Sequence, residues 1–508
     1  MIKDGASLPE VSMVSVAEPS AAGTELVRFW NESRLRADQA KSTSVRSAPK
    51  IVPWRAALED VLKVGYGVEN QSRYVAGSWQ RVRRLTTPSA GGLYPFEVFA
   101  AIAGEGSYLW EADKGRLVPC VLEPLAHEDL AAAGFNAPPG HRLEALLILI
   151  ARPWLSMKKY YQRGYAYCHL DVGHLAANLA IYTAALGHDS TLHLRFSRTA
   201  LAEHLKLGGL CREPLAVLSF AAARPVAGPE PAAGPAALAG VEAATLESPE
   251  EPEIRVWESL RGILSFDCPV APPCPPARAP LLVEPAAVPE EAILPLPLGR
   301  AQPSAAREWR AAILGRRSAK GFRDEPLSAA HIGELLGALR DEGVPSDFSQ
   351  DASARLGVRL VARNVEGLEG VFAYAPRSHS LHRLAERTDD PRPACMHQEI
   401  ARDAAALVIL HAPICHLMDR QGYSAFCELH IRAAELAQRL YLAAARIGAV
   451  GMTCIGGFDS HECSILARLE DADEALYVIL LGIPDEAAVK QDRLSVAFSH
   501  GYTATQEG

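Results

Sequence analysis

Two short segments carry residue types that suit an anion or a planar ring. The first, PSAGGLYP (88–95), places Gly91 and Gly92 side by side before an apolar, β-rich run. Adjacent glycines cost backbone entropy and mark either a turn with positive φ or a close approach to the main chain. The second, RRSAK (316–320), offers two guanidinium groups, a hydroxyl and an ammonium, which suit a phosphate dianion. Taken alone, these residues favour a tight turn before a buried strand and a basic, solvated helix start.

A third segment, KKYYQRGYAYCHLDVGH (158–174), brings ammonium, phenol, imidazole and carboxylate groups close together in sequence. It leads into HLDVGHLAANLAIYTAALG (169–187), whose apolar positions recur every three or four residues and which ends in glycine, a normal helix stop. A similar amphipathic helix is expected at 428–448. The residues that could do chemistry therefore lie just before, and at the start of, a long helix.

The two halves of the chain share an order of elements. Each half contains a strand, a glycine-containing turn and a second strand with aromatic residues, at 95–119 and at 358–384. After its amphipathic helix, each half has a related segment, 195–207 or 457–469, that precedes an apolar strand. Repetition of this kind indicates a duplicated α+β domain.

The composition changes sharply near residue 222. Residues 222–251 are dominated by Pro, Ala, Gly and Glu and contain no aromatic residue, so a linker is predicted there. A short helix is expected at 254–264, followed by a second Pro-rich run. The predicted organisation is a tail (1–24), a first domain (25–221), a Pro/Ala-rich linker with a short helix (222–299) and a second domain (300–508).

Bulk properties exclude several classes of protein. At 508 residues, the chain is too long for a single hydrophobic core. Its net charge of -9 argues against a general nucleic-acid binder, and no apolar run approaches the length of a membrane span. The ten cysteines form no CxxC pair, so no zinc site or thioredoxin-type site is predicted. Scattered cysteines and an N-terminus without an apolar signal core indicate a cytoplasmic protein without a metal site.

Four segments together resemble the nitroreductase superfamily, and within it the SagB-type dehydrogenases that oxidise azolines to azoles during maturation of ribosomal peptides. They are RRSAKGFRDEPLS (316–328), PSAGGLYP (88–95), KKYYQRGYAYCHLDVGH (158–174) and GMTCIGGFDSHECSILARL (451–469). The resemblance covers about 25–221 and 300–495. It implies two nitroreductase-like domains, each with a central, mostly antiparallel sheet flanked by helices, fused in tandem as an intramolecular pseudo-dimer.

Members of this family bind FMN at a dimer interface, where one subunit supplies the Arg-Arg-Ser segment and the other supplies Pro-Ser-Ala-Gly-Gly. The two halves of this chain have lost different pieces. The first shows only TSVRSAPKIVPW (43–54) where RRSxR is expected, and LHLRF (192–196) in place of CIGGF. The second shows QDASARLG (350–357) for PSAGGLYP and Leu417-Met418 at the Lys-Tyr position. We therefore expect one composite FMN site per chain and one degenerate site.

The resemblance implies a set of FMN contacts. At the phosphate we expect Arg316, Arg317, Ser318 and Lys320; beside the ring Pro88, Ser89, Ala90, Gly91 and Gly92; at the ring edge Gly456 and Gly457 with Phe458; and further charge from Lys490 and Arg493. Two of these assignments keep an equally simple alternative. The ring-edge segment also fits a loop before a helix capped by Asp459 or Ser460, and the last two residues fit solvated basic side chains.

Lys159 and Tyr160 take the Lys-Tyr position of the SagB-type enzymes. Azoline oxidation removes a proton from Cα and a hydride from the adjacent carbon, so a base is needed beside the flavin. A phenol with an ordinary pKa near ~10 is a poor base, and a neighbouring ammonium lowers that pKa. Lys158 and Tyr161 leave the register open by one residue, and local sequence also fits an aromatic, basic surface loop. Asp171 and His174 are expected to be structural.

The resulting expectation is an FMN-dependent azoline dehydrogenase. Its substrate would be a modified precursor peptide and its partners cyclodehydratase proteins, with no nucleic acid and no membrane. The internal pseudo-dimer removes the usual need for a second copy, so a monomer is compatible with this reading. Two alternatives remain: another FMN oxidoreductase acting on a small-molecule or carrier-bound substrate, and a flavin-free scaffold subunit of a biosynthetic complex.

Overall fold

The computed structural model describes residues 53–75, 78–103, 105–120, 135, 141–205, 207, 211–223, 255, 280–300, 302–340, 345–346, 355–486, 488 and 502–503. The predicted tail, most of 43–54, most of the linker, and Lys490 and Arg493 lie outside these residues.

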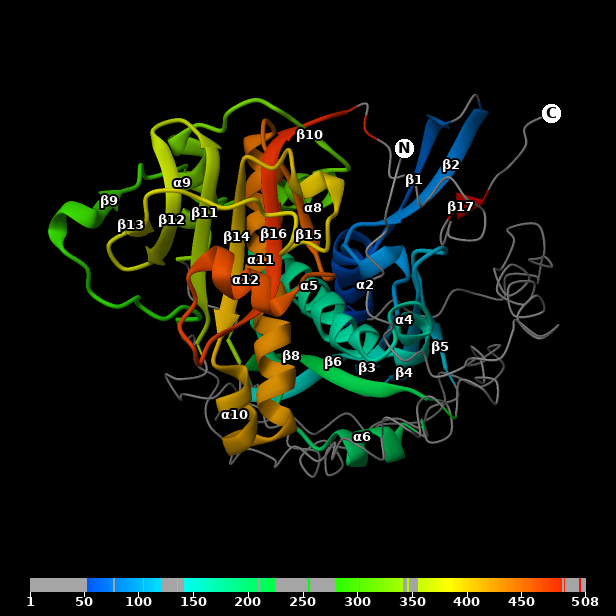
Figure 1. The fold of residues 1–508 in the computed structure, drawn as a ribbon. Helices are drawn as coiled ribbons and strands as arrows, with labels where there is room; N and C mark the ends of the chain where they lie inside the picture. Colours follow the sequence, from blue (N-terminus) through cyan, green and yellow to red (C-terminus); the bar gives the residue numbers. More distant parts are fainter. Residues whose placement is uncertain are drawn as a thin grey trace. The chain divides into compact units, whose positions relative to one another are not determined.

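The first half forms an antiparallel sheet in the order β5-β4-β3-β6-β8-β7 (Figure 1). Its strands are β3 (Phe96–Ile102), β4 (Gly106–Glu111), β5 (Arg116–Pro119), β6 (His141–Ala151), β7 (Ser190–His193) and β8 (Glu213–Ala223). The interior strand β6 carries the run ALLILIA, which is buried as expected for a strand covered on both faces.

The second half repeats that sheet as β13-β12-β11-β14-β16-β15, with β9 added beside β13 and β10 beside β16. The strands are β9 (Ile293–Pro295), β10 (Phe322–Arg323), β11 (Gly357–Val365), β12 (Leu368–Ala375), β13 (Ser380–Ala385), β14 (Ala406–Ala412), β15 (Gly451–Ile455) and β16 (Glu474–Pro484). The repeated strand order is the arrangement expected for two domains of one fold.

The helices repeat as well. α4 (Pro153–Tyr160) and α5 (Arg163–Ala185) in the first half correspond to α10 (Ile414–Gln421) and α11 (Tyr423–Ile447) in the second. Tyr161 and Gly422, 261 positions apart, have nearly the same backbone angles at the ends of α4 and α10. The other helices are α2 (Pro53–Gly65), α6 (Arg198–His204), α8 (Ala306–Gly315), α9 (Ala329–Gly337) and α12 (Ser460–Ala467).

α5 and α11 lie side by side (Figure 1) and tie the two halves together. A Cβ added at Gly173 of α5 would come within 2.5 Å of the Ile431 carbonyl oxygen on α11, so only glycine permits this approach. Each helix also enters the other half's core: Leu170 packs in the core of the second sheet, and Leu442 in that of the first. The two sheets accordingly belong to one compact unit, Val52–Gly508.

Several elements differ from the sequence-based expectation. α5 begins at Arg163 rather than at 169, because the aromatic turn that precedes His169 is buried and helical. β9 lies inside the predicted linker, where Ile293–Pro295 pairs with β13. A further small antiparallel sheet, β1 (Val68–Val75), β2 (Ser78–Leu85) and β17 (Tyr502–Thr503), had no counterpart in the expectation.

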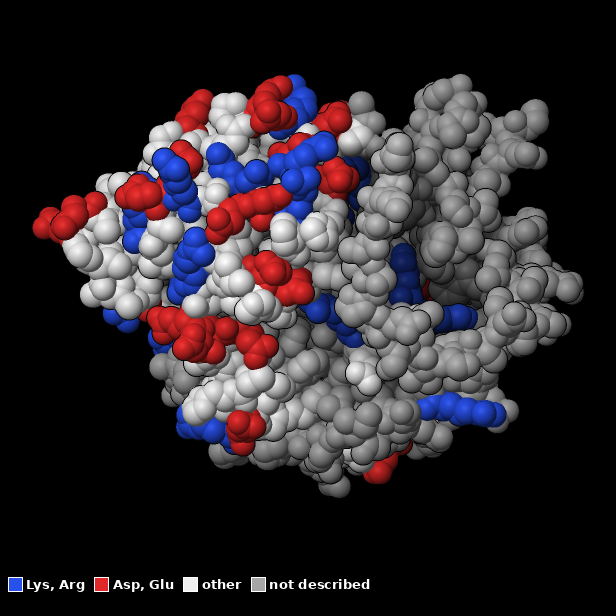
Figure 2. All heavy atoms as spheres, in the orientation of Figure 1, with Lys and Arg blue, Asp and Glu red and all other residues white. Residues whose placement is uncertain are grey.

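Among the described helices, none is long and apolar enough to cross a membrane. The described residues also contain no group of three or more His, Cys, Asp or Glu side chains arranged to hold a metal ion. On the face shown in Figure 2, Lys and Arg are interspersed with Asp and Glu over the described residues.

Candidate functional site

The glycine pair predicted from PSAGGLYP sits in a tight loop held by a buried carboxylate. The Ser89 hydroxyl donates to Asp171 Oδ2 at 2.5 Å, and the Ala90 N–H donates to Oδ1 at 3.0 Å. Gly91 and Gly92 then take φ values of 63° and 68°. Burial raises the pKa of Asp171 to about 7, against the two hydrogen bonds, which lower it. Asp171 on α5 therefore holds the loop in place through these two hydrogen bonds.

Lys159 and Tyr160, at the end of α4, lie directly against Gly91. A Cβ added at Gly91 would overlap the Tyr160 hydroxyl oxygen and come within 3.2 Å of Lys159 Nζ. The Lys159 ammonium lies 5.3 Å from the centroid of the Tyr160 ring. Of the two flanking residues, Lys158 is exposed and Tyr161 is 70% exposed. The loop thus meets Lys159 and Tyr160 rather than the exposed Lys158 and Tyr161.

The second half contributes Arg316, which follows α8 and is buried. Its Nε donates to the Thr86 carbonyl oxygen at 2.9 Å, and its Nη1 donates to the Ser318 hydroxyl at 3.3 Å. The guanidinium carbon also lies 5.1 Å from the centroid of the Tyr441 ring. Thr86 stands two residues before the PSAGG loop, so this contact joins the two predicted pieces from opposite halves of the chain.

Three guanidinium groups gather at this junction. Arg84 donates through Nη1 to the Arg316 carbonyl oxygen and through Nη2 to that of Leu314 at 3.3 Å. Burial, and then the charges of Arg317 and Arg316, lower the pKa of Arg84 to about 9. Within the described residues, no carboxylate forms an ion pair with Arg316. A buried guanidinium without a carboxylate, beside two others, suits an anionic ligand.

Arg84, Thr86 and Tyr441 were not among the residues predicted from the sequence. Arg84 was visible as part of the RVRR run before the glycine loop, but nothing in the sequence tied it to Arg316. Tyr441 accepts or donates a hydrogen bond with the Ser318 hydroxyl at 2.9 Å and accepts from the Cys454 N–H at 3.2 Å. It therefore links the Arg-Arg-Ser segment to β15.

The remaining residues of the Arg-Arg-Ser segment lie beside β15. The Ala319 N–H donates to the Met452 carbonyl oxygen at 2.8 Å, and the partly buried Lys320 ends the segment. Arg317 is exposed and donates through Nη1 to the Leu314 carbonyl oxygen at 2.7 Å.

Gly456 and Gly457 lie where the first half touches the end of β15. Arg163 Nε donates to the Gly456 carbonyl oxygen at 2.9 Å, and its guanidinium lies 4.4 Å from the centroid of the Phe458 ring. A Cβ at Gly456 would come within 2.6 Å of the Tyr167 ring. Asp459 caps α12 by accepting from the Glu462 N–H, so the segment is both a capped loop and a contact between the halves.

His174 lies in a buried polar chain between α5 and α11. Its Nδ1 pairs with Gln438 Oε1 at 2.9 Å and its Nε2 with the Tyr477 hydroxyl at 3.0 Å. Gln438 in turn donates to Asn178 Oδ1 at 2.6 Å. Burial lowers the pKa of His174 to about 3, so the imidazole is neutral. It is a hydrogen-bonded packing residue, as its sequence position indicated.

The second half contains a counterpart of the junction, which we call the counterpart side, and residues 261 positions apart occupy equivalent positions in the two halves. Several of these equivalent positions carry different residue types. Arg420 and Gln421 end α10 where Lys159 and Tyr160 end α4. The expected equivalents, Leu417-Met418, were therefore wrong by three residues, because the second half has no Lys-Tyr pair to mark the register.

The place of Asp171 is taken by Arg432, which is fully buried. Arg432 Nη1 lies 2.7 Å from Glu435 Oε2 and its Nη2 donates to the Ser346 hydroxyl at 2.6 Å. A cation at this place cannot accept the two hydrogen bonds that Asp171 accepts, so the counterpart side lacks the device that holds the glycine loop.

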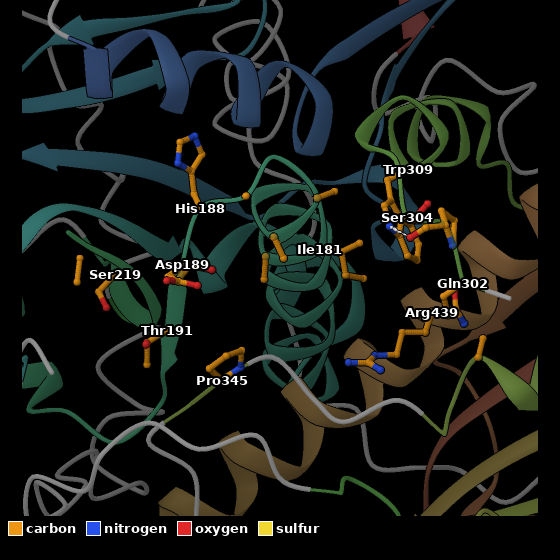
Figure 3. Close-up of a pocket in the computed structure, with 18 of the residues that line it drawn as sticks. Ile181, His188, Asp189, Thr191, Ser219, Gln302, Ser304, Trp309, Pro345 and Arg439 are labelled. Carbon is orange, nitrogen blue, oxygen red and sulfur yellow. Dashed lines mark hydrogen bonds between the residues drawn. The ribbon is translucent and has the colours of Figure 1, made fainter. Parts of the chain in front are cut away.

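A cavity of about 780 Å³ lies beside the end of α5 (Figure 3). Ile181, His188 and Thr191 line it from the first half, and Trp309 and Arg439 from the second. Neither Gly91 nor Arg316 borders it.

Residues 313–483 match the model of the Nitroreductase family. A Methanocaldococcus jannaschii protein assigned as a nitroreductase, MJ1384, is 27% identical over 155 residues, 30% of this chain and 73% of that protein.

Two solved structures illustrate the range of structural similarity. One, assigned as a nitroreductase from Anabaena variabilis, superposes with a TM-score of 0.66 at 20% identity, covering 90% of this chain and 97% of that one. A chain of the E. coli microcin synthetase McbBCD complex with truncated pro-MccB17 bound gives a TM-score of 0.26 at 18% identity, covering 42% and 84%. The second value carries no argument about function. The first, which spans both sheets, shows that this chain has a nitroreductase-like fold.

Proposed function

We propose that this chain is an FMN-dependent oxidoreductase that holds one flavin between its two halves and oxidises azoline rings of a modified peptide to azoles. The observation that carries the proposal is the meeting of complementary pieces. The glycine loop and the Lys-Tyr pair come from the first half, and the Arg-Arg-Ser segment comes from the second.

The residues at this junction fit the parts of FMN. Arg316, with Arg84 and Arg317 beside it, provides buried positive charge of the kind that a phosphate requires. Gly91 and Gly92, both with positive φ, give the loop no side chain of its own, and Tyr160 and Lys159 fill the place that a Cβ at Gly91 would take. FMN, when bound, supplies the acceptor for the hydride. A scaffold protein that binds no flavin would not need to keep one complete set of these residues. Their retention therefore favours a flavin-binding protein over the scaffold alternative.

Lys159 and Tyr160 are the groups that we assign to proton transfer. The Tyr160 hydroxyl abuts the glycine loop that would face the ring, so it can take the proton from Cα while the hydride leaves the adjacent carbon. Lys159, over the same phenol ring, favours the deprotonated form of that oxygen. Asp171 has a positioning role, because it holds the loop and touches neither group.

The azoline substrate, the precursor peptide and cyclodehydratase partners come from the resemblance to SagB-type enzymes. The test uses purified protein loaded with FMN and a synthetic peptide that contains thiazoline or oxazoline rings. We expect the peptide mass to fall by two hydrogens for each ring oxidised. Turnover of free small substrates with no loss from any azoline peptide would reject azoline oxidation in favour of another flavin reaction.

Single variants test the proposed base. Tyr160→Phe should retain FMN and lower kcat by roughly 100-fold or more, the scale of a lost acid–base group. Tyr182→Phe is the matched control, because this hydroxyl donates to Asp60 on α2, away from the glycine loop. Equal rates for the two variants would remove Tyr160 from the chemistry.

A further inference from the structure

Tyr161 has a backbone conformation that side chains rarely adopt. It follows α4 with φ 54° and ψ −143°, a region that is strained for any bulky residue. The counterpart, Gly422, follows α10 with φ 61° and ψ −144°. The same turn is therefore built twice, once with the residue that it favours and once with tyrosine.

Packing does not compensate for this strain. The Tyr161 side chain is 70% exposed, and its hydroxyl forms no hydrogen bond with any residue that the structure describes. Its main-chain bonds, from its N–H to the Met157 carbonyl and from the Gly164 N–H to its carbonyl, do not depend on the side chain. Glycine would serve the fold better here, as it does at 422.

The strained residue lies at the rim of the candidate site. It comes directly after Tyr160, whose hydroxyl abuts Gly91. Two residues further on, Arg163 holds the Gly456 segment from the opposite half. An exposed aromatic ring at this rim is open to a ligand that approaches the glycine loop.

We propose that Tyr161 is a specificity-determining residue, whose ring stacks on the planar five-membered heterocycle of the substrate or on the planar peptide group next to it. This inference rests on the proposed function. Strain is tolerated at functional positions when the side chain gains a contact elsewhere, and an aromatic ring gains most from another flat, apolar face. The ring acts in binding, and the proton is moved by Tyr160.

The experiment compares four variants in the full chain with FMN bound. Tyr161→Gly and Tyr161→Asn both suit positive φ but lack the ring, Tyr161→Phe keeps the ring, and Gly422→Tyr puts equal strain in the other half. The last variant meets open space, since nothing lies within 4 Å of a Cβ at Gly422. Each is measured for melting temperature and for KM and kcat on the azoline peptide.

We expect stability and binding to move in opposite directions. Tyr161→Gly should raise the melting temperature by roughly 2 °C, and should raise KM about tenfold, the scale of a lost stacking contact, with kcat within about twofold. Tyr161→Asn should show the same rise in KM, and Tyr161→Phe should restore the wild-type KM. Gly422→Tyr should lower the melting temperature and leave KM unchanged.

Three results would overturn the proposal. An unchanged KM in both Tyr161→Gly and Tyr161→Asn would show that the ring binds nothing. A fall in kcat at constant KM would show that Tyr161 instead positions Tyr160. A wild-type enzyme that turns over no azoline peptide would reject the proposed function, and this inference with it, whereas normal wild-type turnover beside unchanged variants rejects the inference alone.

Discussion

The Arg316 guanidinium donates its Nε hydrogen to the Thr86 carbonyl oxygen at 2.9 Å, joining residues 230 positions apart in the chain. Thr86 leads into the glycine loop and Arg316 opens the Arg-Arg-Ser segment. The family that this chain resembles is expected to build its site across two subunits, and here a single chain brings both kinds of segment to one junction.

Substitution of Gly91 by alanine should lower turnover far more than its backbone penalty explains. The new Cβ meets the Tyr160 hydroxyl and Lys159, so the pair must move. A displacement of about 1 Å at a reacting group costs on the order of 100-fold in rate. The matched control is Gly187→Ala, with φ 83° and nothing within 4 Å of the new Cβ. Comparable kcat values in the two variants would contradict the contact.

Asp171 should make the protein less stable as pH rises. Its pKa is about 7 in the folded chain, above the value of 3.8 expected when unfolded, so the folded state binds the extra proton between these values. Stability from this group is complete below pH 3.8 and is lost as pH rises towards 7, at roughly 1.4 kcal/mol per pH unit. Asp171→Asn should flatten that part of the curve of urea midpoint against pH. A variant with the wild-type slope would refute the assignment.

Three buried histidines should have the opposite effect at acid pH. Burial lowers the pKa of His174 to about 3 and of His430 to about 4, and lowers that of His169 as well. The unfolded chain takes up these protons below about pH 6.5 and the folded chain does not, so stability falls as pH decreases from there. His430→Gln should remove about one proton from the slope between pH 6 and pH 4.5. Titration of unfolding at fixed urea checks this.

The buried ion cluster on the counterpart side should stabilise the fold without affecting flavin. Glu435 contacts both Arg432 and Arg439 and is 2% exposed. Glu435→Ala removes the carboxylate that these buried cations share and should cost about 3–5 kcal/mol. The exposed pair Glu399–Arg402 gives the control, where Glu399→Ala should cost about 0–1 kcal/mol. Loss of FMN from a folded Glu435→Ala protein would indicate that the flavin binds on the counterpart side, and would contradict a site at the Arg316 junction.

The sequence predicted the α+β class and both long helices, because these depend on local periodicity, whereas the choice of segments expected to meet came from the resemblance to a family. It did not predict β9, since a Pro-rich run reads as a linker, whereas an edge strand tolerates Pro295. The bonds from Asp171 to the glycine loop and from Arg316 to Thr86 were also beyond reach. They join residues 81 to 230 positions apart, and no local pattern in the sequence indicates such pairings.

The strain at Tyr161 illustrates the same limit. Two consecutive tyrosines after two lysines look alike in sequence, and both could have been the partner of the glycine loop. The turn after α4 separates them, because Tyr160 ends the helix against Gly91 and Tyr161 turns out with positive φ.

The central claim is one composite flavin site per chain, and the most direct measurement is the amount of FMN released per denatured chain. The account predicts one FMN for the wild type, loss of it in Arg316→Ala, and no change in Arg420→Ala, which lies in the other half's counterpart of the Lys-Tyr position. Two FMN per chain would mean that the counterpart side is a working site. None after incubation with excess FMN would contradict the account and favour a flavin-free scaffold.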